Sequence, residues 1–253
     1  MMSPIFDRCI FGSLARITDL SARPFEIEPR VPSEWDTGDY VVGIVTDTSG
    51  YRAIELPSGR NMEVAEGDAV VGAFGTRHAT LEMTGSWREI GDDQLMHALT
   101  RAGLFGHVES RSTLVQPPLE LRYHGHVCRD ATKVTMAGAV PPVDEQSYTT
   151  PTILFAGTSM SAGKTTAARI VTRRLKRMGL DVLGAKVSGA GRYRDVLSIQ
   201  AAGADWGPAV LAAGLPSTVI PAEEYRTAAR HLLSPIALST AAGPSVESCP
   251  SPP

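Results

Sequence analysis

Residues 151–189, PTILFAGTSMSAGKTTAARIVTRRLKRMGLDVLGAKVSG, are the stretch that decides the fold predicted from the sequence. An apolar run over 152–156 leads into a loop of small residues over 157–163. A helical pattern over 165–178 follows, and a second apolar run over 182–187 comes after it. Strand, loop, helix and strand in this order form a βαβ unit, whose crossover places both strands parallel in one sheet. We therefore predict a C-terminal domain of the α/β class, with a phosphate-binding loop (P-loop) and a parallel sheet.

The loop between the first strand and the helix has the composition of an anion-binding turn. Small residues let several backbone N–H groups approach one phosphate group, and the new helix adds the positive end of its dipole. We expect Lys164 to reach the β- and γ-phosphates and the Thr165 hydroxyl to bind magnesium. The alternative is a glycine-rich turn that binds nothing. The predicted nucleotide-binding residues are Gly157, Thr158, Ser159, Ser161, Ala162, Gly163, Lys164, Thr165 and Thr166.

The spacing of this loop differs from the standard motif by one residue. Four residues usually separate the two glycines, whereas five separate Gly157 from Gly163. The pattern Gly-Thr-x-x-x-x-Gly-Lys-Thr resembles the P-loop of dethiobiotin synthetase and its relatives in the SIMIBI class of P-loop proteins. The resemblance covers residues 151 to about 225 and does not include the N-terminal half of the chain.

The same resemblance implies roles for two residues beyond the loop. The second strand of that family ends in a lysine followed shortly by Ser-Gly, and residues 185–189 are similar. Lys186 would then contact the substrate and the transferred phosphoryl group, so that Lys164 and Lys186 are the predicted catalytic residues. Asp195 occupies the position of a magnesium-binding aspartate, which makes Thr165 and Asp195 the predicted metal ligands. The alternatives are a solvated lysine at a strand end and an aspartate that caps a helix over 196–202.

The N-terminal half shows a different pattern, of short strands and turns. Residues 38–43 (GDYVVG) and 67–72 (GDAVVG) are nearly identical, and in each we expect a Gly-Asp turn, a strand that begins with the valines and a closely packed final glycine. Short strands separated by turns at this spacing predict a small barrel or sandwich. We also predict a helix over about 92–106 and two strands, over 119–127 and 133–140.

These patterns divide the chain into four parts. We predict a β-rich domain over 1–140, a linker over 141–150, a partial P-loop NTPase domain over 151–235 and a disordered tail over 236–253. Within the third part we expect a third strand over residues 215–220 and a helix over 223–233. No apolar strand that ends in an acidic residue follows residue 222, so the predicted P-loop domain looks shortened. Either a partner chain, such as a second copy in a homo-oligomer, completes its sheet, or its catalysis is weak.

Composition narrows the classes of partner. The 253 residues carry a net charge of −3, which gives no basic footprint for nucleic acid, and no apolar run has the length of a membrane span. The three cysteines form no CxxC pair, which favours a cytoplasmic location. His124, His126 and Cys128 alternate along one predicted strand and could share a face. Their stepwise separation of about 7 Å is too long for all three to bind one metal ion easily.

The function that these residues predict is ATP- and Mg²⁺-dependent. An enzyme of the dethiobiotin synthetase-like class would phosphorylate a small carboxylate-type substrate, and the N-terminal domain would shape the substrate site or mediate association. A first alternative is a nucleotide-binding regulator or metallochaperone in which little chemistry occurs. A second is a non-catalytic interaction protein whose loop is vestigial. The chain lacks a guanine-reading N-K-x-D motif, which favours ATP over GTP.

Overall fold

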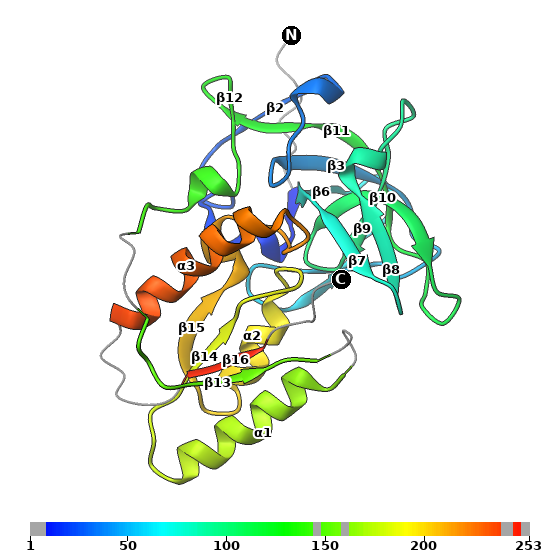
Figure 1. Cartoon of the computed structure of the whole chain (residues 1–253). Helices are drawn as coiled ribbons and strands as arrows, with labels where there is room; N and C mark the ends of the chain where they lie inside the picture. Colours follow the sequence, from blue (N-terminus) through cyan, green and yellow to red (C-terminus); the bar gives the residue numbers. More distant parts are fainter. Residues whose placement is uncertain (1–8, 144–147, 158–161, 239–244, 249–253) are drawn as a thin grey trace. The chain divides into compact units, whose positions relative to one another are not determined.

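The computed structural model describes residues 9–143, 148–157, 162–238 and 245–248 (Figure 1). The chain forms two compact units. The larger unit contains residues 1–140 together with two short later segments, 190–193 and 214–216. The smaller unit contains the remainder of residues 141–253.

The larger unit is built from short strands. Their bounds are β1 Cys9–Phe11, β2 Glu26–Glu28, β3 Tyr40–Asp47, β4 Ala53–Glu55, β5 Asn61–Glu63, β6 Ala69–Phe74, β7 Thr76–Ala79, β8 Met83–Ser86, β9 Leu95–Thr100, β10 Leu104–Arg111, β11 Glu120–Arg129 and β12 Thr132–Lys133. Ten of them form one mixed sheet in the order β1-β6-β3-β11-β9-β10-β8-β7, with β2 and β12 paired to β11. A further pairing of β10 with β6 closes the path β6-β3-β11-β9-β10 into a ring. Short 3-10 helices lie at Ser13–Ile17, Pro32–Glu34, Trp87–Glu89 and Ala137–Ala139.

The two similar hexapeptides pair with each other at the centre of this sheet. β3 and β6 run antiparallel, with Val42 opposite Val71, and both valines are fully buried. Gly72 is required by close packing, because a Cβ atom there would lie 2.3 Å from the backbone oxygen of Gly103. Gly38 and Gly67 have φ angles of 85° and 89°, which glycine adopts without strain. The predicted turns, strands and closely packed final glycine are confirmed.

The helix predicted over about 92–106 is wrong, because β9 and β10 occupy this stretch as an antiparallel pair. Its apolar residues suit a helix by spacing, but Met96 and Ala98 alternate into the core of the ring. Gly103, with a φ of 87°, provides the sharp turn that connects the strands. Of the two strands predicted next, the first is confirmed by β11, and β12 is only a two-residue strand.

The smaller unit contains a four-stranded parallel sheet and the α-helices of the described residues. Its elements are β13 Thr152–Phe155, α1 Lys164–Arg177, β14 Leu183–Lys186, α2 Tyr193–Gln200, β15 Asp205–Ala209, α3 Ala222–Leu238 and β16 Ser245–Ser248, with a 3-10 helix at Val210–Ala213. The strand order is β13-β16-β14-β15, and every pair is parallel. The strands predicted over 152–156 and 182–187, the helix over 165–178 and the helix over 223–233 are confirmed.

Two predictions in this unit are wrong. No strand forms over 215–220, and β15 takes the place of the predicted third strand. Residues 205–209 contain Pro208, which suits an edge strand, and β15 lies at the edge of its sheet. Residues 245–248, which belong to the tail predicted to be disordered, form β16 between β13 and β14. The strand that the sequence pattern did not reveal, β16, is therefore short and mostly polar.

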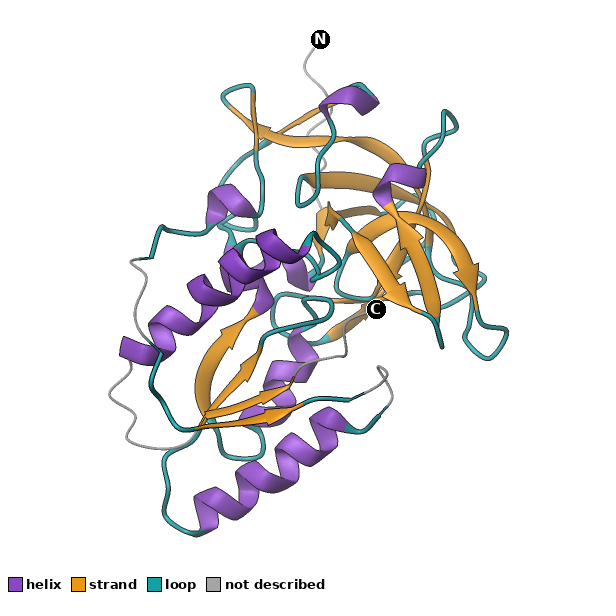
Figure 2. Ribbon diagram, viewed as in Figure 1, coloured by secondary structure: helices purple, strands orange, loops and turns teal. Residues whose placement is uncertain are grey.

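The predicted fold class, an α/β P-loop domain with a parallel sheet that follows a β-rich domain, is wrong. The chain is mostly β-sheet (Figure 2). Its main element is the ten-stranded mixed sheet, and only three α-helices occur in the described ranges. The prediction gave most weight to one βαβ segment, whereas most of the strands come from residues 9–133. None of the helices in the described part is long and apolar enough to cross a membrane.

Candidate phosphate-binding site

The predicted phosphate-binding loop connects β13 to α1. β13 ends at Phe155 and α1 begins at Lys164. Residues 158–161, and with them the predicted binding residues Thr158, Ser159 and Ser161, lie outside the described part of the chain. Gly157, Ala162, Gly163, Lys164, Thr165 and Thr166 lie within it.

The two ends of the loop lie close together. A Cβ atom built on Gly157 would be 3.1 Å from the Cβ of Ala162 and 3.2 Å from the Cγ of Lys164. The aliphatic part of Lys164 therefore folds back over the beginning of the loop, where only a glycine leaves room for it. The two described ends of the loop, Gly157 and residues 162–164, therefore meet at the start of α1.

Gly163 lies directly before α1 and carries no side chain that could block the start of the helix. It precedes α1 with a φ of 79°, and no atom of the other described residues beyond its chain neighbours lies within 4 Å of the position that a Cβ would occupy. Its carbonyl oxygen accepts the first helical hydrogen bond, from the N–H of Ala167 at 2.9 Å. The N–H groups of the first turn have no acceptor within the helix, and that turn contains no acidic residue. The first turn of α1 therefore presents no carboxylate that would repel an anion.

Lys186 and Asp195 form an ion pair at the end of β14. The Lys186 ammonium donates to Oδ2 of Asp195, and the lysine side chain is 11% exposed. Gly189 follows with a φ of 90°, and a Cβ there would lie 3.9 Å from the Lys186 Nζ. Lys186 is therefore not a solvated lysine. Asp195 is the third residue of α2, which begins at Tyr193, so it is not the cap of a helix over 196–202.

The register of the sheet places this ion pair at the same edge as the loop. Phe155 of β13 is opposite Ser248 of β16, and Glu247 of β16 is opposite Ala185 of β14. Because the three strands are parallel, the loop that follows Phe155 and the end of β14 at Lys186 leave the same edge of the sheet. The backbones of β13 and β14 are two strand spacings apart, about 10 Å.

The predicted metal ligands, Thr165 and Asp195, lie on two different helices, α1 and α2. Thr165 is the second residue of α1, and the carboxylate of Asp195 is paired with Lys186. In the described ranges, no group of three or more His, Cys, Asp and Glu side chains is arranged to hold a metal ion. Two oxygen donors from the protein still fit magnesium, which usually takes its other ligands from phosphate oxygens and water.

The prediction that His124, His126 and Cys128 could share a strand face is wrong, because β11 carries a bulge. Tyr123 pairs with Gly43, and Gly125 pairs with Val42. Because Gly43 and Val42 are neighbours in β3, β11 carries one extra residue, His124, at this point. The bulge changes the alternation, and as a result Tyr123 and His126 point to the same side, with 2.6 Å between the tyrosine oxygen and the imidazole Nδ1. His126 is fully buried, whereas His124 lies in a surface depression.

The bulge assembles a buried polar network that the sequence did not predict. The imidazole Nε2 of His126 lies 3.1 Å from Oδ2 of Asp39, which also accepts from the Lys133 ammonium at 2.6 Å. The backbone N–H of Asp36 donates to the same oxygen at 2.8 Å. Burial acts to raise the pKa of Asp39, but the hydrogen bonds outweigh it and hold this pKa below its ordinary value. Because Asp39 and His126 are at most 1% exposed, the network stabilises the ring of strands and is closed to substrates.

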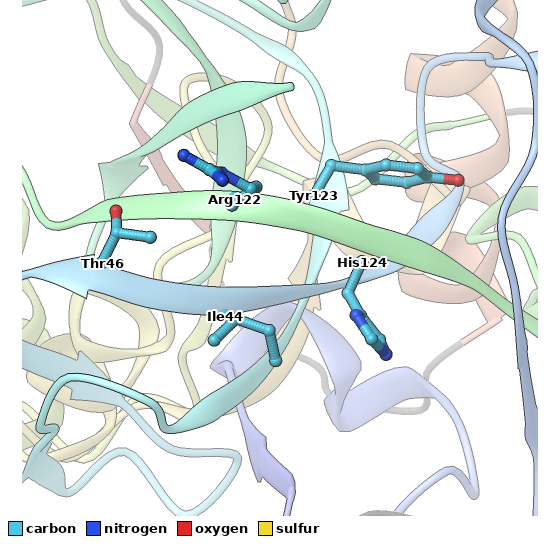
Figure 3. Close-up of a pocket in the computed structure, with 5 residues that line it drawn as sticks. All are labelled: Ile44, Thr46, Arg122, Tyr123 and His124. Atoms are coloured by element: carbon cyan, nitrogen blue, oxygen red, sulfur yellow. The ribbon is translucent and has the colours of Figure 1, made fainter. Parts of the chain in front are cut away.

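The surface depression beside the bulge is a concave feature of the larger unit. It has a volume of about 370 Å³ and lies over β3 and β11 (Figure 3). Its lining residues are Ile44, Thr46, Arg122, Tyr123 and His124. The Thr46 hydroxyl already donates to Glu120 at 2.8 Å, and none of the five lining residues is an acid. The loop after β13 is therefore the stronger candidate.

Comparisons with known proteins add no further assignment: no protein-family model, curated protein or solved structure matches this chain.

Proposed function

We propose that residues 157–166 bind the phosphates of a nucleoside triphosphate, ATP by preference, together with Mg²⁺. The observation that carries this proposal is the contact between Gly157 and the Lys164 side chain, which closes the loop on itself. The unobstructed helix start at Gly163 supports it, since N–H groups at a helix N-terminus attract anions. Lys164 would neutralise the β- and γ-phosphates, and Thr165 would contribute a hydroxyl to magnesium.

Lys186 and Asp195 would act at the neighbouring strand end. The ammonium of Lys186 would turn from Asp195 toward the transferred phosphoryl group, and the released carboxylate would become available to the magnesium ion. In this exchange the Lys186 ammonium would replace the carboxylate with a phosphate, and the Asp195 carboxylate would replace the ammonium with Mg²⁺. Each group would therefore keep a partner of opposite charge. The reaction that fits these groups is ATP-dependent phosphorylation of a small carboxylate-type substrate, with Lys186 holding the acceptor.

A second candidate function is nucleotide binding without turnover. Lys186 and Asp195 already pair with each other, and the described residues contain no group of three or more His, Cys, Asp and Glu side chains that could hold a metal ion. A regulator of this kind would bind ATP and change the contacts of its loop, but it would release phosphate slowly with every acceptor.

Thermal unfolding with Mg-ATP, Mg-GTP or no nucleotide tests the binding site. Saturation at 100 times the dissociation constant should add about 2.7 kcal/mol of stability to the wild type. Lys164→Ala should lose this gain, whereas Arg173→Ala, an exposed change further along α1, should keep it. An equal gain for Lys164→Ala and wild type would show that Lys164 does not contact the nucleotide. Phosphate release with and without small carboxylic acids then separates the enzyme from the regulator.

A further inference from the structure

The end of β9 is the centre of a polar cluster in the larger unit. The Tyr51 hydroxyl donates to the carbonyl oxygen of Ala98. Nη1 of Arg77 donates to the next carbonyl oxygen along the strand, that of Leu99, at 2.7 Å. Arg101, the residue after β9, places its guanidinium carbon 5.3 Å from the centroid of the Tyr51 ring. Arg77 and Arg101 therefore both lie beside the residues that end this strand.

A third arginine, Arg192, is held in the same unit by both of its neighbours in the chain. Before it, the carbonyl oxygen of Gly191 accepts from Nη1 of Arg16 at 2.9 Å. After it, the backbone N–H of Tyr193 donates to Oε1 of Glu55 at 2.8 Å, and Glu55 is 2% exposed. Arg16 and Glu55 thus fix the backbone on either side of Arg192.

The charges of these arginines act on one side chain, Tyr51. Burial raises the pKa of Tyr51 to about 12. The positive charges of Arg77, Arg101 and Arg192 act on the same hydroxyl in the opposite direction. Because Coulomb interactions weaken with distance, all three guanidinium groups lie near this hydroxyl.

Two of the three arginines lack a carboxylate partner. Arg77 forms an ion pair with Glu82. Arg101 and Arg192 form no ion pair with any residue in the described ranges. The other carboxylate of the cluster, Glu55, accepts from a serine hydroxyl at 2.5 Å and from a backbone N–H. Three arginines thus accompany two glutamates, so positive charge is in excess.

Several polar atoms of the cluster are buried without a partner. Nε of Arg77, Nε of Arg192 and Oγ1 of Thr100 form no hydrogen bond with any part of the chain that the structure describes. Thr100 is 5% exposed, and the side chain of Arg77 is 10% exposed. Buried polar groups are nearly always hydrogen-bonded, and a buried charge is costly unless it is paired. These atoms therefore indicate an acceptor from outside the chain.

We propose that Arg77, Arg101 and Arg192 bind a small oxyanion beside Tyr51, namely the phosphate or carboxylate group of a small molecule. Such a group accepts from two N–H groups of one guanidinium at the same time, and its charge offsets the excess of arginine over glutamate. A water molecule would accept from the buried N–H groups but would leave the positive charge in excess. The three arginines lie outside residues 157–166, so this inference does not depend on whether the loop binds nucleotide.

Thermal unfolding at increasing anion concentration tests the proposal. Inorganic phosphate and glutarate are the two probes, and sodium chloride at equal ionic strength is the control for screening. All titrations use Lys164→Ala, because phosphate could also bind residues 157–166 of the unmodified protein. The unfolding temperature should rise to saturation with at least one probe, and the tighter probe shows whether the ligand presents a phosphate or a carboxylate. No saturable rise with either probe would overturn the proposal.

Further substitutions in the same protein locate the binding site. Arg101→Gln and Arg192→Gln each remove a positive charge and should weaken binding of the probe about tenfold, which is about 1.4 kcal/mol. Arg101→Lys and Arg192→Lys keep the charge but lose the guanidinium fork, so they should weaken binding less. Arg122→Gln makes the same change at an exposed arginine of the larger unit and should leave the affinity unchanged. Equal affinity of Arg101→Gln, Arg192→Gln and Arg122→Gln for the probe would refute the proposal.

Discussion

Asp39 and Asp195 are aspartates that each bind a lysine, yet their surroundings differ. Asp39, in the larger unit, is 1% exposed and accepts from Lys133, His126 and a backbone N–H. Asp195, in the smaller unit, pairs with Lys186 and keeps 31% of its side chain exposed. A carboxylate with several buried donors cannot leave them without a large loss of stability, whereas a partly exposed one can exchange its partner for a ligand. The network around Asp39 therefore suits a structural role, and the pair of Asp195 with Lys186 suits a binding or catalytic role.

Removal of each carboxylate should show the largest difference between these two sites. Asp39→Ala leaves Lys133 and His126 without their buried acceptor, and we expect it to lower the free energy of unfolding by about 3–5 kcal/mol. Asp195→Ala should cost about 1–3 kcal/mol, because Asp195 is partly exposed but Lys186, at 11% exposure, loses its carboxylate partner. Urea unfolding measures both values. Glu63→Ala, which removes an exposed carboxylate 3.7 Å from Arg52, is the control and should change stability by less than about 0.5 kcal/mol. Equal losses for Asp39→Ala and Asp195→Ala would remove the distinction.

Two glycines extend the comparison to the backbone. Gly72→Ala introduces a Cβ 2.3 Å from the Gly103 oxygen, which strands on both sides hold in place, and should destabilise by about 1–3 kcal/mol. Gly163→Ala meets open space and has only its φ of 79° against it, so the expected loss is about 1 kcal/mol. Urea unfolding gives both costs. A larger loss for Gly163→Ala would mean that the helix start is packed rather than open.

The sequence allowed prediction of local elements better than of the whole fold. The βαβ segment from 152 to 186 and the paired hexapeptides were predictable, because glycine turns and apolar runs are local signals. The fold class was not, because the ring of strands depends on long-range pairings such as β10 with β6. β16 was missed for a related reason: Ser245–Ser248 contains one apolar residue, and its place in the sheet comes from its neighbours rather than from its own pattern.

The candidate site shows the same division. Gly157, Gly163 and Lys164 were found from their spacing, and the structure places Gly157 beside Lys164. The pairing of Lys186 with Asp195 was not predicted, since it depends on how α2 returns to the end of β14. The network around Asp39 was also missed, because a single-residue bulge at His124 determines which side chains of β11 face inward. A bulge changes the register without leaving a pattern in one sequence.

The pH dependence of stability is the smallest effect that separates a buried carboxylate from an exposed one. Hydrogen bonds hold the pKa of Asp39 below the ordinary value of 3.8, so folding favours its charged form. Its contribution to stability is therefore complete above pH 3.8 and is lost as the pH falls through the lower folded pKa. Urea unfolding at about pH 6 and about pH 3 should show a steeper loss of stability for wild type than for Asp39→Asn, which cannot titrate.

Asp47→Asn is the control for this measurement. Hydrogen bonds from Ser49 lower the pKa of Asp47, but this aspartate lies at the protein surface, where water screens the interaction. A variant at Asp39 with the same pH slope as wild type would show that the network does not favour the charged carboxylate.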